Sequence, residues 1–575
     1  SLLFVSFKEE ITSPLATHLQ NSIQKSDGLR VHFVQYDLIQ TAVDKMVKND
    51  TVLLTALSLI LVLVGFYLFT FSLRGLLLIA LIIAFNVSGL FLIMYVGSIP
   101  FTMHMISIPC IITVLSFTDI MHILYYQQQE YQAVSTDQAL QLRILSTVGT
   151  PLLLTSLTNS IGFIVFLLFA KNIYLFQFSL IAFLGVVIAY GSARLLVIPL
   201  MTTRTIYVKR NQFEFLHSLH DQLSGWFKDR RRYLLPSFIV VFLVLLLDVS
   251  AHFRIDNLDH NQNMKASPLA SGQAILQEHF FGAKRAEIFV ALKTGSVWDK
   301  AVLDRLEWIE AQLAQDFSPF YINSPLMIVR RYHRYLSNGE PAAFAVPHKL
   351  NDTYQEQLSR FQNKLGGDGI VDTTATKARM VFGFHHLPLH EARSAYAKLA
   401  KVLEEQSDEV VQFELSGLQY LSDEATYQFS VKVLWGLLVS IVFGSILVLY
   451  WLKSWRKSVG VFLVNSFPLL FALALLLYWG VAISPMTLFL LSVLLGICVD
   501  DSIYLIIQHS NGEHRVHLVP IFITSFVLSL GFLSLNWAHF AWLQPFGFLF
   551  LLGISLAYLL DFFVLPLFLK NHLEE

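Results

Sequence analysis

The chain has few residues that could cross-link it or bind a charged polymer. It contains two cysteines, Cys110 and Cys498, and both lie inside long apolar runs, so a disulfide framework is not expected. Charged residues make up only 14% of the 575 positions, and the formal net charge is -1. This balance excludes a broad basic surface, and we expect no nucleic acid partner.

What the chain has in excess is apolar sequence. Hydrophobic residues make up 55% of the chain and the mean hydropathy is +0.58, more than one soluble core requires. A membrane-spanning helix needs about 20 mostly apolar residues. Eleven stretches come near that length, at 51–71, 75–96, 100–125, 150–170, 173–201, 233–249, 432–451, 459–479, 484–508, 517–537 and 542–569. The sequence therefore predicts a polytopic α-helical membrane protein.

The basic residues predict the orientation of these spans, because Lys and Arg gather in short cytoplasmic loops. The loop 202–232 carries seven Lys or Arg residues against three acidic ones. If this loop is cytoplasmic, the turns at Arg74 and at Lys453 also lie inside. Segments 1–50 and 250–430 then lie outside, which is the periplasm if the membrane is a bacterial inner membrane.

Segment 250–430 reads as alternating strands and amphipathic helices. Strands are expected at 286–292, 378–384 and 410–415, with helices at 296–315 and 390–406. Units of this kind predict a small α+β domain. The adjacent His385 and His386 would point to opposite faces of a strand, so no metal site is expected there.

The chain contains an internal repeat. Segment 1–36 repeats the strand, helix and strand order of 378–415, and each copy runs into a span. Pro151-x-x-x-Thr155-Ser156 and Gly162 match Pro520-x-x-x-Thr524-Ser525 and Gly531 with the same spacing. Two related halves explain both matches, and we expect a twelfth span and most of one outer domain to precede Ser1. The predicted organisation is an outer-domain remnant at 1–50, five spans in 51–201, a cytoplasmic loop at 202–232, one span at 233–249, a second outer domain at 250–430, five spans in 431–569 and a cytoplasmic tail at 570–575.

Two of the predicted spans carry carboxylates away from their ends. Asp119 lies in the third span, and Asp500 and Asp501 lie in the ninth. Ionisable groups in mid-membrane are costly and mark functional sites by default. Overlaying the halves places Asp119-x-x-His122 on Asp501-x-x-Tyr504, so each half offers a carboxylate and a polar ring one helical turn apart. Burial favours the neutral form of a carboxylate, and this pattern is typical of proton handling.

A static polar network is the alternative for these carboxylates. In that network, hydroxyls of Thr155, Ser156, Thr524 and Ser525 would cap the acidic side chains. A further pair, Arg194 and Asp561, stands five residues before Pro199 and Pro566. These two side chains could pair or gate, but we expect them to lie near the cytoplasmic ends of their spans, where long side chains reach the interface.

The chain resembles the resistance-nodulation-division (RND) superfamily in four features. These are GICVDDSIY in the ninth span, its DIMH counterpart in the third, the paired P-x-x-x-T-S-x(5)-G spans, and the pattern of one span before and five spans after an outer domain. The MMPL-type and hydrophobe/amphiphile exporters, which also resemble Patched and sterol-sensing proteins, are the nearest branch. The resemblance implies two pseudo-symmetric halves of six spans, periplasmic porter domains and export driven by protons through acidic residues of the third and ninth spans seen here. One departure is that the Gly-x-Gly before the acidic residues is Gly496-x-Cys498 in one half and is missing before Asp119.

The sequence and the resemblance together predict a transporter and not an enzyme. We expect it to use protons as the coupling ion, without a cofactor or metal, and to move lipids, sterol-like or other amphiphilic molecules. Expected partners are membrane lipids, the hydrophobic substrate, and periplasmic or outer-membrane proteins; both trimers and monomers occur in families of this kind. The alternatives are a sterol-sensing-like regulator that binds lipid without pumping, and an accessory of protein secretion.

Overall fold

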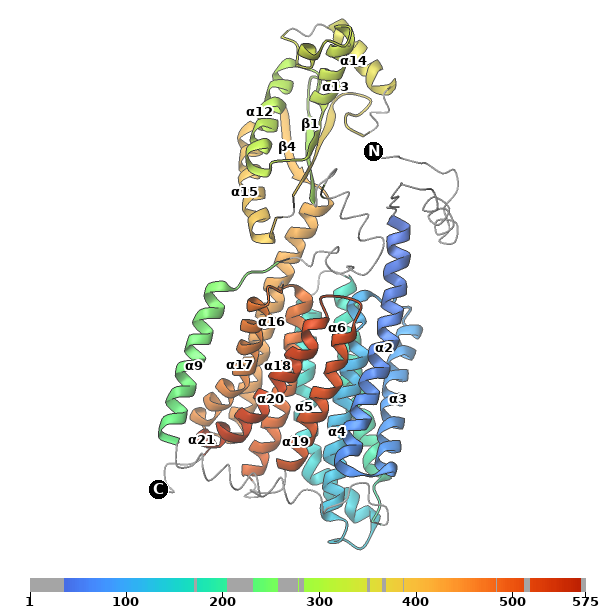
Figure 1. Cartoon of the computed structure of the whole chain (residues 1–575), viewed down its shortest axis with the longest axis vertical. Helices are drawn as coiled ribbons and strands as arrows, with labels where there is room; N and C mark the ends of the chain where they lie inside the picture. The colour runs from blue at the N-terminus through green and yellow to red at the C-terminus, as the bar shows by residue number, and fades with distance from the viewer. Residues whose placement is uncertain are drawn as a thin grey trace, which may run out of the picture. The chain divides into compact units, whose positions relative to one another are not determined.

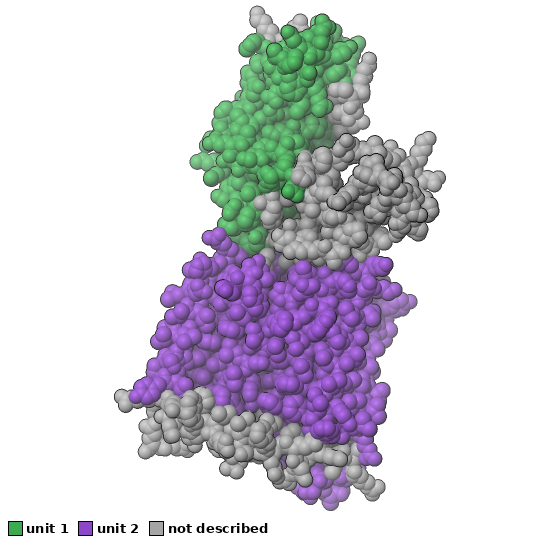
Figure 2. All heavy atoms as spheres, viewed as in Figure 1, with its two compact units in different colours: residues 1–34, 255–261, 265–428 green, residues 35–254, 262–264, 429–575 purple. Residues whose placement is uncertain are grey.

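A computed structural model describes residues 36–169, 173–203, 231–256, 278, 284–348, 352–364, 369–385, 387–481, 483–510 and 518–569. The chain forms two compact units, coloured separately in Figure 2. We call them the helical unit (35–254, 262–264 and 429–575) and the sheet unit (1–34, 255–261 and 265–428). The predicted first strand–helix–strand copy, most of the loop 202–232 and the tail 570–575 lie outside the described residues.

The helical unit is built from long apolar helices (Figure 1). Among the described residues, eleven helices are long and apolar enough to cross a membrane, at the positions that the sequence predicts, which supports a multi-pass membrane protein. They are α2 (Tyr36–Thr70), α3 (Leu73–Val96), α4 (Ile108–Glu130), α5 (Asp137–Phe169), α6 (Ile173–Ser192), α9 (Arg231–His252), α16 (Leu418–Leu452), α17 (Trp455–Tyr478), α18 (Pro485–Ser510), α19 (Leu518–Leu533) and α20 (Gln544–Phe563). Short elements extend some of them: η1 (Met103–Met105), the π-helical η2 (Ala193–Val197), α7 (Ile198–Leu200), η6 (Ser534–Trp537) and α21 (Leu565–Leu569).

Pairs of helices match across the chain in length and in the turns that end them. Helices α2 and α16 both have 35 residues, α3 and α17 both have 24, and each second member starts 382 positions after the first. The turn after α2 contains Phe71 at φ 46° and the turn after α16 contains Lys453 at φ 48°. The next turns contain Ser98 at φ 50° and Gly480 at φ 68°, again 382 positions apart. The left-handed backbone is uncommon for Phe, Ser or Lys, so its recurrence at matched positions strengthens the sequence match.

Two helices are much more enclosed than the others. In the most apolar window of each span, 94% of the residues are buried for the span containing α4 and 89% for the span containing α18. The other spans range from 17% for α9 to 72% for α19. A span with few buried residues presents its apolar side chains to lipid, whereas α4 and α18 present theirs to other helices. They are therefore the central helices of the unit.

In the described residues of the sheet unit, four strands form one antiparallel sheet in the order β2-β3-β1-β4. The strands are β1 (Lys284–Leu292), β2 (Tyr321–Asn323), β3 (Lys377–Phe384) and β4 (Val411–Ser416), and in the register Ile288 lies between Met380 and Leu415. Strands β1 and β4 alternate buried and exposed side chains, as expected when helices cover one face of a sheet. The strands β1, β3 and β4 and the helices α12 and α15 were predicted from the sequence.

Helices α12 (Lys300–Phe317) and α15 (Leu389–Gln406) lie side by side against the sheet (Figure 1). Their buried positions follow the helical period, as at Leu306, Ile309 and Leu313. Helices α13 (Pro325–Leu336) and α14 (Asp352–Lys364) and the short η5 (Pro341–Ala343) complete the unit. Trp298 and Phe382 are among the largest side chains in its core.

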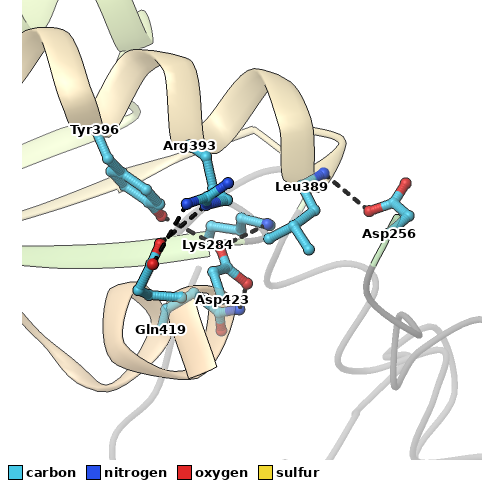
Figure 3. Close-up of polar contacts among 8 residues, drawn as sticks. Asp256, Lys284, Leu389, Arg393, Tyr396, Gln419 and Asp423 are labelled. Carbon is cyan, nitrogen blue, oxygen red and sulfur yellow. Dashed lines mark hydrogen bonds and ion pairs between the residues drawn. The ribbon is translucent and has the colours of Figure 1, made fainter. Parts of the chain in front are cut away.

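A buried ion pair joins the sheet to the first turns of α16 within the sheet unit (Figure 3). Lys284 Nζ of β1 lies 2.8 Å from Asp423 Oδ2, and both side chains are almost fully buried. Gln419 Nε2 donates to Asp423 Oδ1 at 3.0 Å, and the Tyr396 hydroxyl donates to Oδ2 at 3.4 Å. Burial and the neighbouring Asp423 carboxylate raise the pKa of Tyr396, so its hydroxyl remains a neutral donor.

Candidate functional site

The two central helices meet through a pair of stacked rings. His122 of α4 and Tyr504 of α18 lie with their ring centroids 3.7 Å apart and an angle of 12° between their planes. Both side chains are buried. These residues occupy equivalent positions when the two halves are overlaid; their direct contact was not predicted from the sequence.

The carboxylates stand one helical turn or less from these rings. Asp119 precedes His122 by three residues, and Asp501 precedes Tyr504 by three, which puts each carboxylate on the same side of its helix as its ring. Asp500 and Asp501 are 5% and 2% exposed, whereas Asp119 is partly exposed. The three carboxylates therefore lie on the two helices that the ring contact joins.

Asp500 lies within electrostatic range of Asp119, and both groups lie within that range of Tyr504. Asp500 Oδ2 accepts a hydrogen bond from Asn159 Nδ2 of α5 at 2.9 Å. Its Oδ1 is buried and has no hydrogen-bond partner among the described residues. One oxygen of Asp500 is thus held by Asn159, and the other has no hydrogen bond within the described part of the chain.

Asp501 points to a different neighbour. Adjacent residues of a helix are about 100° apart around its axis, and Asp501 Oδ2 accepts a hydrogen bond from Ser525 Oγ of α19 at 2.7 Å. The sequence overlay pairs Asp119 with Asp501, but in the structure the electrostatic partner of Asp119 is Asp500. The two halves are therefore not equivalent at this site.

The four hydroxyls suggested as caps behave differently from one another. Ser525 holds Asp501, as the static-network alternative suggested. Thr155 and Thr524 donate instead to backbone carbonyls of their own helices, at Leu152 and Pro520. Ser156 is buried. Of these four side chains, Ser525 alone has a hydrogen bond to a carboxylate among the contacts of the described residues.

Asn159 is a site residue that the sequence reasoning missed. It occupies a place close to Gly496, where a Cβ atom would overlap its Oδ1. The absence of a side chain at Gly496 is what lets the Asn159 amide reach Asp500 on the next turn of α18. The available signal was an amide side chain one turn beyond Thr155, in the polar stretch TSLTNS of a predicted span.

The expected interfacial position of Asp561 is wrong. Its side chain is 1% exposed, and its Oδ1 lies 2.5 Å from Ser502 Oγ of α18. The equivalent Arg194 is exposed and donates to the Tyr190 hydroxyl at 2.8 Å. Asp561 lies on the face of α20 that packs against α17 and α18, and position along a span does not reveal which face a residue occupies.

The site combines carboxylates without a fixed cation. Among the described residues, no Lys or Arg forms an ion pair with Asp119, Asp500 or Asp501, and no three His, Cys, Asp or Glu side chains form a metal-binding group. Ionising two nearby buried carboxylates at the same time is energetically unfavourable when neither has a basic partner. Chemically, the arrangement suits the binding and release of a proton.

Comparison with models of known protein families and with curated protein sequences gives no match for this chain.

Proposed function

We propose that this chain is a secondary active transporter of the RND type, driven by protons and moving lipids or other amphiphilic molecules across or out of a bacterial inner membrane. The observation that carries the proposal is the His122–Tyr504 stack, which holds the Asp119 and Asp500 helices together at the centre of the helical unit. The matched helices and turns, 382 positions apart, support the two related halves of this fold.

The coupling would come from the charge on the carboxylate pair. When Asp119 and Asp500 share a proton, one negative charge is removed and α4 and α18 pack closely. When both are ionised, repulsion in a poorly solvated region disfavours that packing. A proton that binds one packing better than the other shifts the balance between them. Exposure of the pair to opposite sides in the two packings would turn a proton gradient into work.

The substrate class rests on the resemblance to lipid and amphiphile exporters. The sheet unit would serve as the periplasmic porter domain, with membrane lipids and periplasmic or outer-membrane proteins as partners. The sterol-sensing-like regulator shares the fold but has no use for a carboxylate pair that lacks a basic partner. The site does not separate a lipid cargo from a secreted peptide, so the secretion accessory remains the second candidate.

The test begins with the purified protein. Lipids that copurify with it are identified by mass spectrometry and labelled for transfer assays. Vesicles containing the protein are then given a pH gradient, and transfer of the labelled lipid is followed with and without an ionophore that collapses the gradient. The proposal predicts transfer that stops when the gradient collapses. Tight lipid binding with transfer that ignores the gradient would favour the regulator.

A further inference from the structure

A second polar cluster lies in the helical unit, on three helices, and includes Ser502, two residues after Asp500 on α18. Ser502 Oγ of α18 lies 3.0 Å from Asn465 Oδ1 of α17 and 2.5 Å from Asp561 Oδ1 of α20. All three side chains are at most 5% exposed. The second carboxylate oxygen of Asp561, Oδ2, is buried and has no hydrogen-bond partner among the described residues.

The hydrogens available to this cluster can be counted. Two oxygen–oxygen contacts at hydrogen-bond distance need two hydrogens, and the Ser502 hydroxyl supplies one. Turning the Asn465 amide around would supply another, but Asn465 Nδ2 already donates to the Val461 carbonyl at 3.1 Å, and the turned amide would put oxygen against oxygen there. The missing hydrogen has to come from the Asp561 carboxyl. Asp561 then donates to Ser502, and Ser502 donates to Asn465.

The surroundings of Asp561 also favour the protonated, neutral form of its carboxyl. Among the described residues, Asp561 has no ion pair with a Lys, Arg or His side chain. The titratable groups whose charges interact with it are Asp501 and Cys498 of α18. The neighbours of Asp561 and Asn465 in the chain, Leu560 and Val464, belong to a buried apolar cluster. An ionised Asp561 would be a buried negative charge beside another carboxylate, which is costly.

We infer that Asp561 is a second proton-binding site, in which the carboxyl is neutral and its proton bridges to Ser502. The first half has no equivalent, because the matched position is the exposed Arg194. The site neighbours Asp501 electrostatically and so adds a proton to the second half alone. Its part in a transport cycle rests on the proposed function, whereas the presence of the proton does not.

Infrared difference spectroscopy of the full chain in detergent tests the inference without any transport assay. The spectrum of Asp561→Asn is subtracted from that of the wild type at neutral pH. The inference predicts that the variant loses a carbonyl-stretch band of a protonated carboxylic acid, and that this band shifts in D2O. Loss of the two bands of an ionised carboxylate instead would overturn it. The exposed Asp304, paired with Lys300, is the matched control, because Asp304→Asn should lose carboxylate bands.

Ser502→Ala keeps the test decisive if Asp561→Asn does not fold. This change removes the acceptor of the Asp561 proton and one small hydroxyl. The acid band should persist and move to higher frequency, as expected for a carboxylic acid that has lost its hydrogen bond. An acid band that does not move would overturn the assignment. Because neither measurement involves a gradient, a positive result would stand even if proton-driven transfer were absent.

Discussion

His122 and Tyr504 stack face to face at the centre of the helical unit, although they lie 382 positions apart in the chain. Stacking of two aromatic rings contributes about 0.5–1.5 kcal/mol beyond burial. The stack also joins α4 and α18, the helices that carry Asp119 and Asp500. The ring contact is therefore a structural support for the carboxylate pair.

The first prediction concerns this stack. Tyr504→Ala removes a fully buried ring and should lower the free energy of unfolding by about 3–5 kcal/mol. Tyr504→Phe keeps the ring and should lower it much less. Thermal unfolding of the detergent-solubilised protein measures both. A double-mutant cycle with His122→Ala should give a coupling of about 0.5–1.5 kcal/mol, and a coupling of zero would contradict a stabilising stack.

The second prediction concerns Gly496. A methyl group there overlaps Asn159, so Gly496→Ala should displace the amide that holds Asp500 and cost about 1–3 kcal/mol through overpacking. Proton-driven transfer should fall more than the amount of folded protein does. Gly444→Ala is the matched control, because a Cβ at Gly444 meets no atom within 4 Å. Equal effects of the two substitutions would count against the close approach of Asn159.

The third prediction concerns the buried ion pair of the sheet unit. Lys284→Met leaves Asp423 buried without its cation and should destabilise the unit by about 3–5 kcal/mol. Adding Asp423→Leu removes the unpaired charge and should recover much of that loss. Hydrogen exchange of the β1 and β4 amides measures the stability of this unit in the intact protein. A double variant as unstable as Lys284→Met would contradict the view that the unpaired Asp423 charge causes the loss of stability.

The fourth prediction concerns acid stability. A hydrogen bond from Arg305, with others from the backbone at Val411 and Val410, lowers the pKa of Asp408 from 3.8 to about 2. A carboxyl with a lowered folded-state pKa stabilises the fold above its unfolded pKa, and that contribution disappears as the pH falls from about 4 to 2. The protection factors of the β4 amides, which correct observed exchange for the pH dependence of the intrinsic rate, should fall over this window in the wild type. In Asp408→Asn the fall should be smaller, and an identical profile would contradict the assignment.

Much of this architecture could be predicted from the sequence. Length and hydropathy give the spans, and alternation of apolar residues gives β1, β3 and β4. The repeat shows that His122 and Tyr504 occupy equivalent positions, but their contact is seen only in the structure. The bond between Ser525 and Asp501 was available as a capping alternative, because the hydroxyl and the carboxylate lie at matched depths of neighbouring spans.

The side-chain contacts of the site could not be predicted, because they depend on which helix faces meet. No local sequence pattern shows that. Asp500 and Asp501 differ by one position, but one turns to Asn159 of α5 and the other to Ser525 of α19. Asp561 seemed interfacial because it lies near the end of its span, whereas it packs inward against Ser502. The hydropathy of a span is uniform around its axis, so it gives no information on these rotations.

The most direct test of the central claim is gradient-driven transfer by Asp119→Asn in reconstituted vesicles, beside Asp500→Asn, Asp501→Asn and the control Asp304→Asn. Asparagine keeps the size of the side chain but cannot carry a proton, so the Asp119 and Asp500 variants should insert normally and lose transfer driven by the pH gradient. Asp304→Asn should match the wild type. Wild-type rates in both Asp119→Asn and Asp500→Asn would contradict proton coupling at this pair.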